Sequence, residues 1–262
     1  MPTTPLIAYA HVGKTFDGGR VVAVDDVSLD VAEGEFLAIV GGSGSGKTTL
    51  LRLANRLIEA DSGSIMVEGE DVRQVDPILL RRRIGYVFQS GGLFPHLTVA
   101  GNIGITPKLT GAPTAEISAR VDELLDLVRL DRAQYRDRLP HELSGGQRQR
   151  VGVARALAAR PRILLMDEPF GALDPLTRDA LGDDYRELHR KLGLTTVMIT
   201  HDMTEAILLA DRIVVMRGGK LLAQGTPSEL SESDDVYVGE LLRTPRRQAK
   251  RLSALLPREG MA

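Results

Sequence analysis

The chain has 262 residues, 43% of them hydrophobic and 26% charged, which is near the average for globular proteins and enough for one large domain. Its 33 Lys and Arg residues against 35 Asp and Glu residues give a formal net charge of -2, so there is no electrostatic basis for binding nucleic acid. Because the chain has no cysteine, disulfides, thiol catalysis and cysteine-ligated metal sites are excluded.

The first residues, MPTTPLIAYAHVGK, do not combine a basic segment with a following apolar stretch. We therefore expect no signal peptide. Apolar residues also never run together for about 18 positions, so no transmembrane helix is expected. Any role at a membrane would then come through a partner.

Short apolar runs separated by turns open the chain. The runs LIAYA and VVAVDDVSLDV flank the turn DGG (17–19), which predicts antiparallel strands. The next run, FLAIV (36–40), is continuously apolar, as expected of a strand buried on both faces. It leads into a glycine-rich loop, and residues 47–58 then predict a helix. Residues 64–69 and 84–89 are further predicted strands.

The pattern becomes mainly helical from Gly91 to about Arg160. Within this region the apolar positions 117, 121, 124, 125 and 128 fall on one face of a helix. We therefore predict a helical subdomain over about 91–160, inserted between strands.

Strands and helices alternate in the remainder. The predicted strands are 162–168, 195–200 and 212–219, and the predicted helices are 175–192 and 203–210. This alternation predicts an α/β fold with a mostly parallel core sheet, beside an antiparallel N-terminal β subdomain and the inserted α-helical subdomain.

A phosphate-binding loop is predicted between the strand 36–40 and the following helix. GGSGSGKT fits the pattern G-x-x-x-x-G-K-[ST]. In such a loop the backbone N–H groups and the helix N-terminus bind phosphates, Lys47 neutralises the β- and γ-phosphates, and Thr48 offers a hydroxyl to Mg²⁺. Its position between a buried strand and a helix favours this function over a flexible glycine turn. The predicted ATP-binding residues here are Gly41, Gly42, Ser43, Gly44, Ser45, Gly46, Lys47, Thr48 and Thr49.

Polar residues at the ends of other strands complete this site. Asp167 ends the buried strand ILLMD and is placed to hold Mg²⁺, while Glu168 follows directly and can polarise the water that attacks the γ-phosphate. Gln89, at the end of IGYVFQ, is expected to complete the metal and water shell, although a capping amide is the alternative. His201 follows TTVMIT at the same edge of the sheet, which favours a catalytic over a structural histidine. Glu168, His201, Lys47 and Gln89 are the predicted catalytic residues, and Thr48, Gln89 and Asp167 are the predicted Mg²⁺ ligands.

Six motifs in a fixed order carry a family resemblance. GGSGSGKTT, VFQ, LSGGQRQR, ILLMDEP, GALD and THD resemble those of the nucleotide-binding subunit of an ABC transporter, over roughly residues 6–230. The resemblance implies that Phe16 stacks on adenine, that Gln89 couples the site to membrane subunits, and that Asp174 lies in the D-loop. It also implies that His201 is the γ-phosphate switch and that the cofactors are ATP and Mg²⁺.

The segment LSGGQ explains why one chain carries two anion sites. In the family that this chain resembles, it closes over ATP held by the phosphate loop of a second subunit. Ser144 and the N–H groups of Gly145 and Gly146, at a helix N-terminus, would complement the γ-phosphate beside Gln147. The implied partners are a second copy in a head-to-tail ATP-sandwich dimer, membrane permease subunits and, indirectly, an extracytoplasmic binding protein. The implied location is peripheral, at the cytoplasmic face of the inner membrane.

The transported solute can only be inferred from resemblance. Residues 55–72, 80–109 and 168–178 resemble most the osmoprotectant importers, which move glycine betaine, choline, carnitine or related quaternary amines. The alternatives are an importer of another solute, such as an amino acid or an anion, and a non-transport ABC ATPase of DNA repair or translation. A catalytically dead scaffold is disfavoured because its critical residues are intact: Lys47, Asp167, Glu168 and His201.

The expected domain organisation is an ABC ATP-binding domain over 1–240 and a basic tail over 241–262. Many osmoprotectant ATPases continue into paired CBS domains, and none is expected here. The tail sequence RTPRRQAKRLSALLPREG predicts a solvated terminal helix, with contact to a membrane surface or a partner as the alternative.

Overall fold

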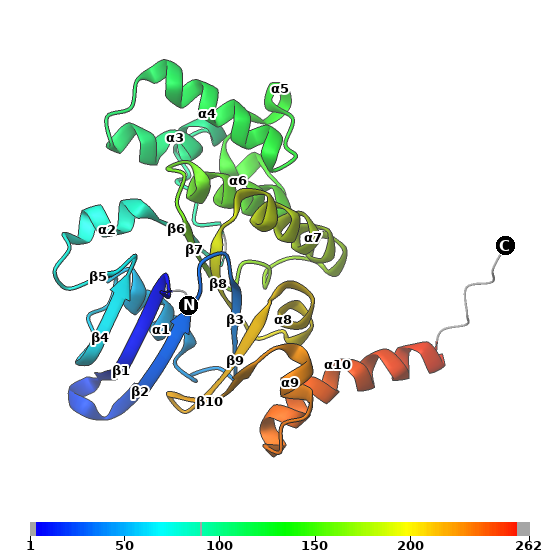
Figure 1. Ribbon diagram of the computed structural model, residues 1–262. Coiled ribbons are helices and arrows are strands. Elements are labelled where there is room, and N and C mark those ends of the chain that lie inside the picture. The colour runs from blue at the N-terminus through cyan, green and yellow to red at the C-terminus, as the bar shows by residue number, and fades with distance from the viewer. Residues whose placement is uncertain (1–3, 90, 256–262) are drawn as a thin grey trace.

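Two β-sheets form the framework of the chain in a computed structural model that describes residues 4–89 and 91–255 (Figure 1). The four-stranded sheet has the order β2-β1-β4-β5 and is antiparallel throughout. Its strands are β1 (Ile7–Phe16), β2 (Val21–Val31), β4 (Ser62–Val67) and β5 (Glu70–Asp71). The 3₁₀ turn Asp17–Gly19 joins β1 to β2, so the predicted antiparallel pair is confirmed.

The six-stranded sheet has the order β10-β9-β3-β8-β7-β6. It comprises β3 (Phe36–Val40), β6 (Ile84–Val87), β7 (Ile163–Asp167), β8 (Thr195–Thr200), β9 (Arg212–Arg217) and β10 (Lys220–Gly225). Every neighbouring pair is parallel except β9 and β10. The predicted α/β fold with a mostly parallel core is therefore confirmed, and the carboxyl ends of β3, β8, β7 and β6 meet at one edge.

Helices cover this framework. They are α1 (Lys47–Ala54), α2 (Pro77–Arg83), α3 (Val99–Leu109), α4 (Thr114–Leu127), α5 (Arg132–Tyr135), α6 (Gly145–Leu157), α7 (Pro175–Leu192), α8 (Met203–Leu209), α9 (Pro227–Ser231) and α10 (Val236–Leu255). In α1, Leu50, Leu51 and Leu53 are buried in a cluster that includes residues of both sheets. Burying each such side chain contributes about 1.5–3 kcal/mol of stabilising free energy, which holds α1 between the sheets.

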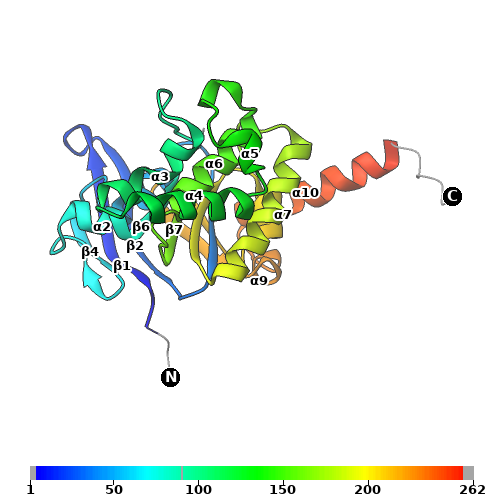
Figure 2. The ribbon, with the colours of Figure 1, turned by 90° about the horizontal axis from the view of Figure 1, so that it is seen from above.

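The helices α3, α4 and α5 lie together at one end of the molecule in Figure 1, and Figure 2 looks down on them from that end. They lie in the chain between β6 and β7, together with α6. The predicted apolar face of α4 is confirmed, since Val121, Leu124 and Leu125 are buried and Ile117 packs against the same core.

Some predicted elements end at other residues. The helix predicted over 47–58 ends at Ala54, because Arg56 has a φ of 55° and the Asn55 side chain accepts a hydrogen bond from the N–H of Leu57. The strand predicted over 84–89 ends at Val87, so Gln89 lies beyond the strand end. The strand β10 was not predicted.

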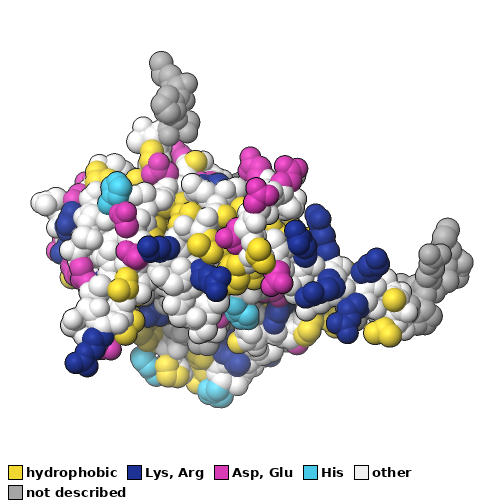
Figure 3. Space-filling view, turned by 90° about the horizontal axis from the view of Figure 1, so that it is seen from below, with side chains coloured by type: hydrophobic (Ala, Val, Ile, Leu, Met, Phe, Trp, Pro, Cys, Tyr) yellow, Lys and Arg dark blue, Asp and Glu magenta, His cyan; other side chains and the backbone are white. Residues whose placement is uncertain are grey.

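The helix α10 projects from the body of the molecule (Figures 1 and 3). It begins at Val236, ahead of the expected domain boundary, which stays a prediction. Val238 and Leu242 anchor its first half in the core. Its exposed basic side chains are Arg243, Arg246, Arg247, Lys250 and Arg251. Residues 256–262 of the predicted tail lie outside the described residues.

None of the helices within residues 4–89 and 91–255 has the length and apolar character to cross a membrane.

Candidate functional site

The glycine-rich loop after β3 has a backbone that only glycine accommodates at its tightest points. Gly46 has a φ of 100°, and a Cβ there would lie 2.0 Å from the carbonyl oxygen of Ala23. At Gly41 a Cβ would lie 2.2 Å from the carbonyl oxygen of Met216. The loop is therefore pressed against β2 and the end of β9, which fixes its path into α1.

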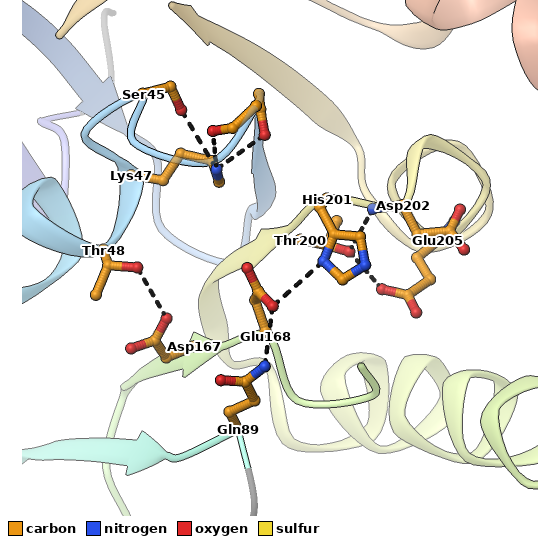
Figure 4. Close-up of polar contacts among 12 residues, drawn as sticks. Ser45, Lys47, Thr48, Gln89, Asp167, Glu168, Thr200, His201, Asp202 and Glu205 are labelled. Carbon is orange, nitrogen blue, oxygen red and sulfur yellow. Dashed lines mark hydrogen bonds and ion pairs between the residues drawn. The ribbon is translucent and has the colours of Figure 1, made fainter. Parts of the chain in front are cut away.

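Lys47 is the first residue of α1, and its ammonium group lies within the loop (Figure 4). Its Nζ donates to the carbonyl oxygens of Gly41 (2.8 Å) and Gly42 (2.9 Å) and to Ser45 Oγ (3.3 Å). Burial lowers the pKa of Lys47, and the carboxylates of Glu168 and Asp167 oppose this shift. Because Gly46 offers no side-chain cap to α1, the helix N-terminus and this cation together favour an anion.

Asp167, at the carboxyl end of β7, faces the start of α1. Thr48 Oγ1 donates to its Oδ1 over 3.2 Å. Arg52 and Tyr86 donate to its Oδ2 over 3.2 and 3.1 Å. Burial and the Asp167 charge raise the pKa of Tyr86 to about 12, with Arg52 opposing, so the phenol remains a donor at neutral pH. The paired oxygens of Thr48 and Asp167 are the hard ligands that Mg²⁺ prefers.

Arg52 and Tyr86 were not predicted. Arg52 lies four residues after Thr48 on α1, and this helical spacing places both side chains on one face. That spacing could have identified Arg52. Tyr86 lies in β6 beside β7, a strand pairing that the sequence does not reveal.

Glu168 brings together the residues predicted at the strand ends (Figure 4). Its backbone has a φ of 47°, and its N–H donates to the carbonyl oxygen of Ile199 in β8 over 3.0 Å. Its Oε2 accepts from Gln89 Nε2 over 3.1 Å and lies 3.2 Å from His201 Nδ1. The structure therefore gathers Glu168, Gln89 and His201 at the carboxyl edge of the sheet. Gln89 directs its amide nitrogen to Glu168, and the predicted role of Gln89 as a magnesium ligand stays a prediction.

Phe16 lies at the end of β1 with 38% of its surface exposed. Lys14 Nζ is 5.4 Å from the ring centroid and also donates to Asp61 over 2.7 Å. Phe16 pairs with Val21 in β2, the strand whose Ala23 faces Gly46 of the loop. The aromatic ring is thus accessible on the strand pair that adjoins the phosphate loop.

The LSGGQ segment forms a capped helix N-terminus. Ser144 Oγ accepts from the N–H of Gln147 over 3.2 Å, and Gln147 Oε1 accepts from the N–H of Ser144 over 2.8 Å. Such a capping box satisfies two backbone donors. A Cβ at Gly146 would lie 2.5 Å from Thr177 Cγ2 in α7, so the segment packs closely on the start of α7. Gly145 and Ser144 are exposed.

Asp174 caps α7 next to this segment. Its side chain accepts from the N–H of Thr177 over 3.0 Å, and this hydrogen bonding lowers the pKa of Asp174. Across the part of the chain that the structure describes, no hydrogen bond joins residues 144–147 to residues 41–49. The chain thus carries two separate clusters, one at the carboxyl edge of the sheet and one at the starts of α6 and α7.

Comparisons with known proteins agree with this geometry. The ABC transporter family model matches residues 24–171, more than half of the chain. The glycine betaine/carnitine/choline transport ATP-binding protein OpuCA of Bacillus subtilis is 52% identical over 86% of this chain and 59% of its own length. The glycine betaine uptake system ATP-binding protein YehX of Escherichia coli is also 52% identical, over 85% of this chain and 71% of its own.

A relative named for another solute has nearly the same identity. The sulfate/thiosulfate import ATP-binding protein CysA 2 of Agrobacterium fabrum is 49% identical over 86% of this chain and 64% of its own length. The chain spans 59% of OpuCA and 63% of OpuBA, the choline transport ATP-binding protein of B. subtilis.

A solved structure shares the fold. The ATP-binding cassette MJ0796, a dimer in a post-hydrolysis state bound to ADP and Pi, aligns with a TM-score of 0.76 and 32% sequence identity, covering 84% of this chain and 98% of the cassette. Together with the loop, the strand-end residues and the LSGGQ segment, these matches show that the chain belongs to the ABC transporter family.

Proposed function

We propose that this chain is the ATP-binding and ATP-hydrolysing subunit of an ABC importer that takes up an osmoprotectant quaternary amine such as glycine betaine, choline or carnitine. The meeting of Glu168 with Gln89 and His201 beside the phosphate loop carries the assignment of hydrolysis. The names of OpuCA and YehX support the quaternary-amine class. Because the identity of CysA 2 is similar, another solute is the alternative that an uptake experiment must test.

The residues divide the chemistry among them. Lys47 and the backbone N–H groups of residues 41–49 would bind the phosphates, and Glu168 would accept a proton from the attacking water. His201, beside Glu168, would contact the γ-phosphate. Thr48, Asp167 and Gln89 would hold Mg²⁺, which when bound neutralises charge on the phosphate oxygens.

We infer that two copies bind head to tail, each completing the site of the other. Phe16 would stack on adenine, and Ser144, Gly145, Gly146 and Gln147 of one copy would cover ATP on its partner, with Asp174 at the interface. The exposed start of α6 and the dimer of MJ0796 support this arrangement. Permease subunits at the cytoplasmic face of the inner membrane and, indirectly, an extracytoplasmic binding protein would complete the importer. Binding to nucleic acid is not proposed.

Glu168→Gln tests the assignment of hydrolysis and the dimer together. The carboxamide keeps the shape of the side chain but accepts no proton, so ATP hydrolysis should fall by about 10²–10⁴-fold, the usual effect of a lost general base. ATP binding should persist, and light scattering should detect a dimer with ATP. Glu187→Gln is a matched control. Glu187 lies in the second half of α7, is exposed, and pairs with Arg129. Unchanged turnover in Glu168→Gln, or an obligate monomer with ATP, would contradict the proposal.

Uptake measurements test the solute. In a strain that lacks other carriers, deletion of the gene should reduce uptake of radiolabelled glycine betaine or choline under osmotic stress. Wild-type protein should restore uptake and Glu168→Gln should not. Normal quaternary-amine uptake after deletion, with a loss of sulfate or amino-acid uptake instead, would establish the alternative class.

A further inference from the structure

Arg178 lies in the first turn of α7 and contacts two parts of the site that are far apart in sequence. Its NH2 donates to the carbonyl oxygen of Leu173 over 3.0 Å, which fixes the loop that precedes α7. Its NH1 donates to Asp202 Oδ2 over 3.4 Å, and its Nε lies 3.6 Å from Glu205 Oε1. One guanidinium thus touches the loop that carries Asp174 and the two carboxylates at the start of α8.

Glu205 and the backbone of Asp202 both bind the Thr200 hydroxyl, next to His201 (Figure 4). Thr200 Oγ1 donates to Glu205 Oε2 over 2.6 Å and accepts from the N–H of Asp202 over 3.0 Å. His201 lies between Thr200 and Asp202 in the chain, so this network fixes its backbone. Its ring needs such support, because the His201 side chain is 61% exposed and, within the described residues, its polar contact is with Glu168.

The contacts of Arg178 with Asp202 and Glu205 are long, at 3.4 and 3.6 Å, and there is space beside them. A cavity of about 130 Å³ lies between α7 and α8, with Arg178, Asp202 and Glu205 in its lining. The Nε of Arg178 is buried without a hydrogen-bond partner among the described residues. The guanidinium can therefore shift and shorten its ion pairs when the loop before α7 moves. Such adjustable charge-assisted contacts are suited to transmitting a displacement.

We propose that Arg178 is a positioning residue that couples the loop 171–174 to His201 through Asp202 and Glu205. When a partner subunit displaces this loop, Arg178 would carry the displacement to the start of α8 and thereby set the position of His201 beside Glu168. The inference rests on the proposed ATPase function and adds a connection between two of its predicted parts. Arg178 itself would touch neither ATP nor water.

Arg178→Met removes the guanidinium and keeps an apolar stem of similar length. Losing charge-assisted hydrogen bonds should lower kcat for ATP about tenfold or more, while KM for ATP changes less than about twofold, because the phosphate loop is untouched. The matched control is Arg186→Met. Arg186 lies on the same helix and pairs with Asp211, which precedes β9 at the opposite edge of the sheet. That variant should keep the wild-type kcat.

Combination with His201→Ala separates positioning from general destabilisation. If Arg178 acts through His201, Arg178→Met should lower kcat in the wild-type background but hardly at all in the His201→Ala background. Equal losses in both backgrounds, or an unchanged kcat in Arg178→Met, would overturn the inference. Should Arg178→Met fail to fold, Arg178→Lys, which retains the charge without the planar fork, carries the same test. An inactive wild-type protein would instead overturn the proposed function, and this inference with it.

Discussion

Two glycines of the phosphate loop form a matched pair that tests how tightly the loop is packed. Both have a left-handed backbone, with φ of 100° at Gly46 and 74° at Gly44. They differ in surroundings. A Cβ at Gly46 would lie 2.0 Å from the Ala23 carbonyl oxygen, whereas a Cβ at Gly44 would have no described residue within 4 Å apart from its two chain neighbours. Alanine substitution therefore adds the same kind of backbone strain at both positions but a steric clash only at Gly46.

The magnitudes follow from these two contributions. The left-handed conformation costs an L-residue about 1–2 kcal/mol, so Gly44→Ala should lose about that much stability. Displacing a close-packed neighbour costs about 1–3 kcal/mol more, so Gly46→Ala should lose about 2–5 kcal/mol. At roughly 2–4 °C per kcal/mol for a chain of this size, the melting temperature of Gly46→Ala should lie about 2–12 °C below that of Gly44→Ala.

Calorimetry and titration with a fluorescent ATP analogue measure the two consequences. Gly46 immediately precedes Lys47 at the start of α1, so a displaced loop should also lose ATP affinity, more severely in Gly46→Ala than in Gly44→Ala. The reasoning would be refuted if both variants had the same melting temperature and the same affinity, since the clash with Ala23 would then carry no cost.

Three further outcomes are expected. Phe16→Ala should weaken ATP binding by about 1–3 kcal/mol, the usual contribution of stacking on a base, and Phe16→Tyr should restore it in the same titration. Ser144→Arg should abolish hydrolysis while ATP binding by the monomer persists; weakened monomer binding would mean that the segment acts within its own chain. Burial and the Arg186 charge lower the pKa of His189, so unfolding experiments should show stability that is full above its ordinary pKa of 6.5 and is lost as pH falls through the lowered value. His189→Asn should show a smaller pH slope.

The sequence was most informative where a continuous apolar run ends at polar residues. The strands β3, β7 and β8 are buried at every position, so their boundaries were visible as a change from apolar to polar residues. The loop after β3, Asp167 and His201 were found in this way. By contrast, β10 alternates between exposed and half-buried residues before its buried last position, and its sequence KLLAQG has no long apolar run that would give a comparable contrast.

Residues that act through other residues were not predicted. No sequence motif assigned a role to Tyr86, Arg178 or Glu205. Their proposed roles at the site depend on contacts with strands and helices that are distant in the chain. Glu205 is 8% exposed, yet its sequence neighbours gave no sign of a buried carboxylate. Burial raises its pKa, and the Thr200 hydrogen bond and Arg178 charge oppose that shift. Such a group is recognised only once the packing of α7 on α8 is known.

Sheet topology explains why the strand-end residues of the site could be placed together from the sequence, whereas the position of the LSGGQ segment could not be derived in this way. The strands β3, β8, β7 and β6 are successive neighbours, and parallel strands bring their carboxyl ends to one edge. Lys47, Gln89, Glu168 and His201 follow these strands, so predicting a parallel sheet was enough to place them along one edge, even though the strand order was unknown. Ser144 follows no strand of that sheet; it caps α6, whose Gly146 packs closely on α7. We infer that the exposed start of α6 contacts a nucleotide bound to a second copy of the chain. ATP would then bind each copy more tightly when its partner is present.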